Sequence, residues 1–123
     1  MIDLKRLVLS FHYAFEGIAH AFFNDQNIRI HTFIAVVVIL AGIFFHVSSM
    51  EMIILVMMIS IIFAAELANT AIEEMVDFIV KEHHPEAKII KDVAAGMVFA
   101  AATGAVIVGL YIFIPHIIRF LTY

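Results

Sequence analysis

The chain has 123 residues, of which 64% are hydrophobic and 15% charged, with a formal net charge of −4 and no cysteine. Soluble domains use about 45–50% apolar residues, so this composition indicates a membrane protein of one domain at most. The lack of cysteine excludes a disulfide framework and thiolate metal sites, and the negative charge without a basic aromatic patch argues against nucleic acid as a partner.

The first predicted element covers residues 3–24 and is an amphipathic helix. Its apolar residues recur at the spacing of one helix face, whereas polar residues such as His12, Glu16 and His20 fall on other faces. Such a helix is expected to lie on the bilayer surface. It differs from a cleavable signal, because polar residues interrupt the apolar segment and no small-residue cleavage site follows. The apolar residues are Leu4, Leu7, Val8, Phe11, Phe15, Ile18, Ala19 and Phe22.

Three apolar runs follow, at residues 30–47, 52–65 and 93–114, and they predict membrane helices over residues 30–47, 52–78 and 89–114. A polar break at residues 24–27 precedes the first run, and a short turn at residues 47–51 joins it to the second. Residues 81–88 form a polar connection to the third run, and Pro85 is well placed to begin a helix there. The predicted fold is a single all-α membrane domain, residues 1–123, with one surface helix and three transmembrane helices that extend into the cytoplasm.

Basic residues gather on one side of this three-span topology. Six lie on that side and only Arg119 on the other, so the positive-inside rule places the six-residue side in the cytoplasm. The six are Lys5, Arg6, Arg29, Lys81, Lys88 and Lys91. Small residues in the third run favour close helix packing, either between copies of the chain or within one chain. These small residues are Ala94, Ala95, Gly96, Ala100, Ala101, Gly104, Ala105 and Gly109.

The second apolar run continues into a stripe of polar residues. Glu66, Asn69, Glu73 and Asp77 fall within an arc of about 80° on a helix, so all four face the same neighbour. Carboxylates at a membrane boundary are costly unless they are paired or bind a cation, and hard oxygen ligands suit Mg²⁺, which commonly bridges to phosphates. The alternative is a solvated helix extension, which suits Asp77 and Glu74 but not Glu66, because Glu66 adjoins the apolar run.

Other polar residues carry weaker functional signals. Lys91, followed by Asp92 just before the third run, could bind phosphate oxygens or anchor the helix at the membrane interface. Asp25 and Arg29 have the i, i+4 spacing of an ion pair. The seven histidines lack the spacing of a zinc site, and the chain has no Walker-A sequence, so any ATP would be bound without a P-loop.

These features together resemble a known family. The pattern Glu66-x-x-Asn69-x-x-x-Glu73-x-x-x-Asp77, followed by Lys91-Asp92 and then Ala-Ala-Gly, is similar to that of the prokaryotic diacylglycerol kinase and undecaprenol kinase family, the small integral-membrane lipid kinases of bacteria. The resemblance covers nearly the whole chain, including the surface helix, the entry to the first span at residues 24–31 and the loop with His84-Pro85. Two positions depart from the family pattern: Asp25, where Glu is usual, and Glu16, where a basic residue is common.

The resemblance implies a homotrimer in the bacterial cytoplasmic (inner) membrane, with active sites shared between subunits at the cytoplasmic side. Such an enzyme transfers the γ-phosphate of MgATP to a lipid hydroxyl. The resemblance makes Glu66 the general base, with Asn69 helping to orient the reacting groups, and makes Asp25 and Glu73 the Mg²⁺ ligands. The residues that it places around the nucleotide are Arg6, Tyr13, Asp77, Glu82, His84, Lys91 and Asp92.

The acceptor and two non-enzymatic hypotheses stay open at this point. The segment from His84 to Gly96 is more similar to the undecaprenol kinase branch, which implies undecaprenol as acceptor, with diacylglycerol as the alternative. A small oligomeric channel would need acids along its path, yet the second run has none between Glu51 and Glu66. A scaffold that docks a soluble partner through the acidic stripe would tolerate Glu66→Gln, whereas a kinase would not.

Overall fold

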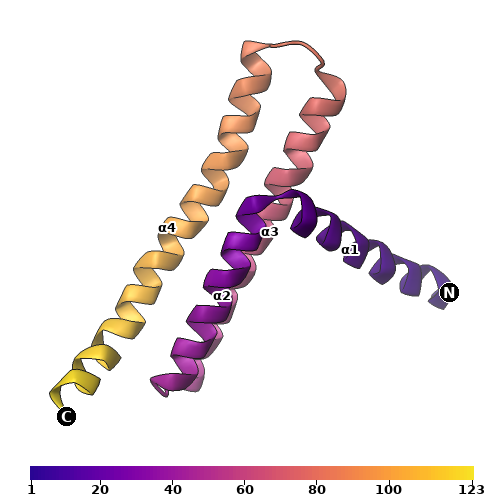
Figure 1. Cartoon of the computed structure of the whole chain (residues 1–123). Helices are drawn as coiled ribbons and strands as arrows, with labels where there is room; N and C mark the ends of the chain where they lie inside the picture. The colour runs from indigo at the N-terminus through magenta and orange to yellow at the C-terminus, as the bar shows by residue number, and fades with distance from the viewer.

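The computed structural model describes residues 1–123 and consists of four helices (Figure 1). They are α1 (Leu4–Asn24), α2 (Gln26–Phe44), α3 (Ser49–Ile79) and α4 (Pro85–Thr122). The last three are each long and apolar enough to cross a membrane, which confirms the predicted all-α membrane class. α3 and α4 pack along each other, and α2 lies against α3.

Helix α1 leaves the bundle sideways at the level where α2 begins (Figure 1). Asp3 starts this helix, because its carboxylate accepts hydrogen bonds from the backbone N–H groups of Lys5 and Arg6. Ala21 is the only buried residue of α1, and its large apolar side chains are exposed, as expected of a helix that lies on a bilayer.

The α3–α4 hairpin extends beyond the level of α1, and the C-terminus lies at the opposite end of the bundle (Figure 1). Helix α3 has 31 residues. At 1.5 Å per residue it is about 46 Å long, which exceeds the ~30 Å thickness of a hydrocarbon core. One end of the hairpin must therefore stand in water, and this is the end that carries the polar stripe.

Local capping decides where the helices begin. Asp25 is the one non-helical residue between α1 and α2, so the predicted four-residue break contracts to a single position and α2 begins at Gln26. Ser48 and Glu51 form a capping box that starts α3. Pro85 occupies the first turn of α4, as its position in the sequence predicts.

Helix α4 continues through Pro115 to Thr122, eight residues beyond the end of the predicted apolar run at 114. Proline removes one backbone donor, which membrane helices tolerate because neighbouring groups satisfy the freed carbonyl. Near this end, His116 Nε2 lies 3.1 Å from Glu51 Oε2 and ties α4 to the start of α3. Edge-to-face aromatic contacts join the same end of α4 to the end of α2, through Phe44, Phe45, Phe113 and Phe120.

Burial is sparse and uneven along the chain. Only 11 of the 123 residues are buried, so most apolar side chains face outward, as expected for helices that contact lipid. One buried group, Gly42 and Leu55, lies where α2 meets the first half of α3. The larger group lies where α1, α2 and α3 converge, and it includes polar side chains. That convergence is the candidate site.

The close approach of α2 to α3 at Gly42 makes a testable prediction. A Cβ at this position would lie 2.8 Å from the terminal methyl of Met52, a flexible group that can shift, and 3.7 Å from Leu55 Cδ1. We expect Gly42→Ala to change the unfolding free energy by less than about 1 kcal/mol and Gly42→Leu to lower it by about 1–3 kcal/mol through overpacking.

Thermal unfolding in detergent measures this difference. Gly109→Ala is the matched control, because a Cβ there meets nothing within 4 Å. A Gly42→Leu protein as stable as the wild type would show that the α2–α3 contact is looser than the structure describes.

Candidate active site

The best-buried polar side chains of the protein lie together on α3. Glu66 is 1% exposed, Asn69 4% and Thr70 9%. Glu66 contacts His31 of α2, and Thr70 contacts Asp25 at the junction of α1 with α2. The polar stripe therefore becomes more exposed along the helix, from buried Glu66 through half-buried Glu73 to exposed Asp77. This gradient follows the passage of α3 out of the bundle into its extension.

Glu66 lacks the hydrogen bonds that a buried carboxylate normally makes. His31 of α2 places its Nε2 atom 3.1 Å from Glu66 Oε1, within ion-pair distance but without hydrogen-bond alignment. Both carboxylate oxygens of Glu66 and the Oδ1 atom of Asn69 are buried without a hydrogen-bond partner. Since buried acceptors in proteins are nearly always paired, these three atoms indicate a place where a ligand supplies the donors.

Three ionisable side chains lie near Glu66. They are His31, Asp25 and Glu73, and each interacts electrostatically with the Glu66 carboxylate. The first two belong to the start of α2 and the last to the next turns of α3. The structure thus brings together the predicted base, Glu66, and the two predicted metal ligands, Asp25 and Glu73, in one chain.

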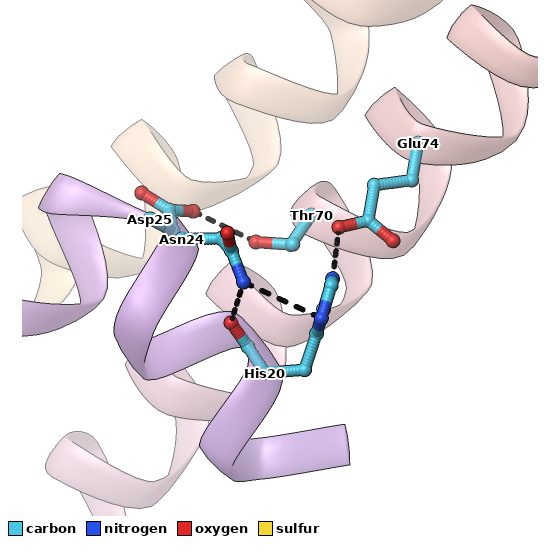
Figure 2. A network of polar contacts seen from close by, with 5 residues as sticks. All are labelled: His20, Asn24, Asp25, Thr70 and Glu74. Carbon is cyan, nitrogen blue, oxygen red and sulfur yellow. Dashed lines mark hydrogen bonds and ion pairs between the residues drawn. The ribbon is translucent and has the colours of Figure 1, made fainter. Parts of the chain in front are cut away.

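Asp25 is held by both of its carboxylate oxygens. Oδ1 accepts from the backbone N–H of Asn27 at 2.8 Å, which caps α2, and Oδ2 accepts from the hydroxyl of Thr70 at 2.7 Å (Figure 2). The ion pair with Arg29 that the spacing suggested does not form. Arg29 instead donates to the carbonyls of Phe22 and Phe23, the last exposed acceptors of α1, at 3.0 Å each.

A second polar contact fastens α1 to α3 beside Asp25. His20 Nε2 lies 2.6 Å from Glu74 Oε1, and Asn24 Nδ2 lies 3.3 Å from His20 Nδ1 and donates to the His20 carbonyl at 2.7 Å (Figure 2). This pattern suits a histidine ring that carries its proton on Nε2 and accepts at Nδ1. The sequence did not predict that His20, Glu74, Thr70 and His31 belong to the site, because only the packing of the helices brings these side chains to the site.

At the outer end of the stripe, α4 contributes a lysine. Lys91 Nζ contacts Asp77 Oδ1 across the hairpin and also interacts electrostatically with Glu73. Lys88 pairs with Asp92 at 2.5 Å on the same helix. Glu73 therefore interacts with a like charge at Glu66 and with an opposite charge at Lys91.

The remaining predicted residues lie apart from Glu66 within one chain. Arg6 belongs to the exposed N-terminal part of α1, where it pairs with Asp3 at 3.5 Å. Glu82 and His84 lie exposed in the α3–α4 connection, and the His84 ring accepts from the backbone N–H of Glu86. Tyr13 lines a groove between α1 and α3 that also includes Gly17, His20, Thr70 and Glu74.

A divalent ion fits the donor chemistry of this site. No group of three or more His, Cys, Asp or Glu side chains in the chain could hold a metal by itself. Mg²⁺ does not need such a group, because it usually takes one or two protein carboxylates and completes its shell with water and substrate phosphates. Asp25 and Glu73 both supply hard oxygen atoms near Glu66.

Comparison with known proteins identifies the family of the chain. Residues 12–113 match the family described as prokaryotic diacylglycerol kinase. The chain is 42% identical to a diacylglycerol kinase of Synechocystis over 91% of this chain and 65% of that protein. It is 39% identical to an undecaprenol kinase of Bacillus subtilis over 94% of each, and 32% identical to a diacylglycerol kinase of Haemophilus influenzae over 80% of this chain and 83% of that protein. With a buried carboxylate at the membrane boundary and this coverage, the chain belongs to the prokaryotic diacylglycerol kinase family of small membrane lipid kinases.

Proposed function

We propose that this protein transfers the γ-phosphate of ATP to the hydroxyl of undecaprenol at the cytoplasmic face of the bacterial inner membrane. The observation that carries the proposal is the carboxylate of Glu66, which is buried, without a hydrogen bond to either oxygen, where an apolar membrane helix gives way to the polar stripe. A lipid alcohol presents its hydroxyl at this depth, because its hydrocarbon body cannot leave the bilayer.

In this proposal, Glu66 accepts the proton of the lipid hydroxyl as general base. Its burial keeps bulk water away from the reacting oxygen, and the His31 ring beside Oε1 limits the orientations that the carboxylate can adopt. The unpartnered Oδ1 atom of Asn69 offers a second acceptor one turn along the helix, which can orient the incoming hydroxyl or a bound water.

Phosphoryl transfer requires in-line positioning and neutralisation of phosphate charge rather than covalent chemistry by the protein. Asp25 and Glu73 would hold Mg²⁺, which supplies that neutralisation when bound with ATP. Lys91 would exchange its contact with Asp77 for the phosphate oxygens, to which a lysine binds as a point charge.

The nucleotide pocket would be completed by a second copy of the chain. Arg6, Tyr13, Glu82, His84 and Asp92 are exposed and distributed over α1, the α3–α4 connection and the start of α4. They could surround one nucleotide if neighbouring subunits of a homotrimer share each site. The unpartnered oxygens of Glu66 and Asn69 support a site that is incomplete within one chain.

One relative supports undecaprenol as the acceptor, because the protein that is matched over 94% of both chains is named undecaprenol kinase. Diacylglycerol is the alternative, since the other two relatives are named diacylglycerol kinases. Both alcohols present a primary hydroxyl on an apolar body, so the chemistry at Glu66 is the same for either acceptor.

A parallel acceptor assay tests the proposal. The purified protein in bilayers is given radiolabelled ATP with undecaprenol or diacylglycerol, with and without Mg²⁺. We expect Mg²⁺-dependent phosphorylation of both, with the higher kcat/KM for undecaprenol. A higher value for diacylglycerol would reverse the choice of acceptor, and no lipid product under any condition would exclude a lipid kinase activity.

A further inference from the structure

The hydroxyl of Thr70 behaves differently from the other hydroxyl groups within the helices. Ser and Thr side chains inside a helix commonly donate to the carbonyl four residues earlier, which satisfies the hydroxyl locally. Thr70 instead donates across to another element, to Asp25 Oδ2 at 2.7 Å. The residues that follow the local pattern are Ser10, Thr32, Ser60, Thr103 and Thr122.

This exception has a physical cause in the charge of the acceptor. A hydrogen bond to a carboxylate is shorter and stronger than one to a neutral carbonyl. Thr70 is also 9% exposed, so water competes weakly for its hydroxyl. The threonine therefore forms a fixed link between α3 and the single non-helical residue that separates α1 from α2.

The same link decides where the Asp25 carboxylate can point. With Asn27 N–H on Oδ1 and Thr70 on Oδ2, rotation of the carboxylate would break one of two hydrogen bonds. Each oxygen keeps a second lone pair that can bind a cation. The His20–Glu74 contact holds α1 to α3 beside this point, so the backbone that carries Asp25 is also restrained (Figure 2).

We infer that Thr70 is a positioning residue, which orients the carboxylate of Asp25 for the divalent cation. The inference depends on the proposed function, in which Asp25 is a metal ligand. Groups that hold a metal ligand in place typically contribute 10–100-fold to metal affinity.

The test compares Thr70→Val, which removes the hydroxyl at nearly constant volume, with Thr70→Ser, which keeps it. We expect Thr70→Val to raise the Mg²⁺ concentration for half-maximal lipid phosphorylation at least about tenfold, with kcat at saturating Mg²⁺ changed less. Thr70→Ser should restore the wild-type value within about twofold, a rescue that depends on the hydroxyl. Thr103→Val is the matched control, because that hydroxyl bonds only within its own helix.

A readout that needs no turnover separates the two proposals. Mn²⁺ binding to each folded variant with a non-hydrolysable ATP analogue, followed by electron paramagnetic resonance, should weaken about tenfold in Thr70→Val and not in Thr103→Val. Unchanged Mn²⁺ affinity and Mg²⁺ dependence in an active Thr70→Val protein would overturn the role of Thr70 and leave the kinase proposal standing. A wild type that phosphorylates no lipid would defeat the kinase proposal, whatever the Mn²⁺ result.

Discussion

Replacing Glu66 by glutamine is expected to lower lipid phosphorylation by about 10²–10⁴-fold, the usual contribution of a general base. Glutamine has nearly the same shape as glutamate, so the buried position between α2 and α3 is still filled. It cannot accept the proton of a hydroxyl. The loss should therefore fall on kcat, because the nucleotide is bound by other residues.

The measurement is the rate of lipid phosphorylation together with equilibrium binding of ATP to the same preparation. Glu86→Gln serves as the control, because this acid is exposed in the first turn of α4 and lies outside the proposed site. Near-normal turnover in Glu66→Gln would contradict the base assignment and favour a scaffold, in which the acidic stripe matters for docking and not for chemistry.

Replacing Glu73 by glutamine is the second large effect that we expect. Glu73 interacts electrostatically with Glu66 and with Lys91, so it holds the central negative charge of the stripe. Removing that charge takes away one of two proposed metal ligands. The Mg²⁺ concentration for half-maximal activity should rise at least about 100-fold. Loss of a residue that only supports a metal ligand costs about 10–100-fold in metal affinity, and loss of the ligand itself should cost at least the upper value.

Initial rates over a series of Mg²⁺ concentrations, at fixed ATP and lipid, give this value directly. Mn²⁺ binding with a non-hydrolysable ATP analogue provides the same comparison without turnover. Glu86→Gln is again the charge-matched control. A Glu73→Gln enzyme with the wild-type metal dependence would remove Glu73 from the metal site, and the ligand beside Asp25 would have to come from elsewhere.

Most of the helical structure could be predicted from the sequence. Long apolar runs predict three spans, and the spacing of Glu66, Asn69, Glu73 and Asp77 predicts one polar stripe on a helix that continues out of the membrane. The errors fall at the ends of helices. The polar residues 24–27 suggest a loop, but capping by Asp25 lets both helices run almost to each other. Pro115 suggests an end to α4, but the helix continues to Thr122.

The contacts between site residues on different helices could not be predicted from the sequence. His20 and Glu74 are 54 positions apart, and Asp25 and Thr70 are 45 apart. Each pair joins α3 to another element, so no period within one helix relates its two members. His31 and Glu66 are likewise far apart in the sequence, and the structure places the His31 ring against the Glu66 carboxylate. Arg29 had the spacing to pair with Asp25 and bonds instead to the carbonyl end of α1.

By itself, the sequence determines the membrane class, the number of spans and the row of carboxylates, because composition and a 3.6-residue period act within one helix. The tertiary structure alone decides that Glu66 is buried without a hydrogen-bond donor, that Thr70 reaches Asp25 and that Lys91 faces Asp77. The reason is that the rotation and depth of each helix against its neighbours depend on side-chain packing between segments far apart in the chain, which no local period encodes.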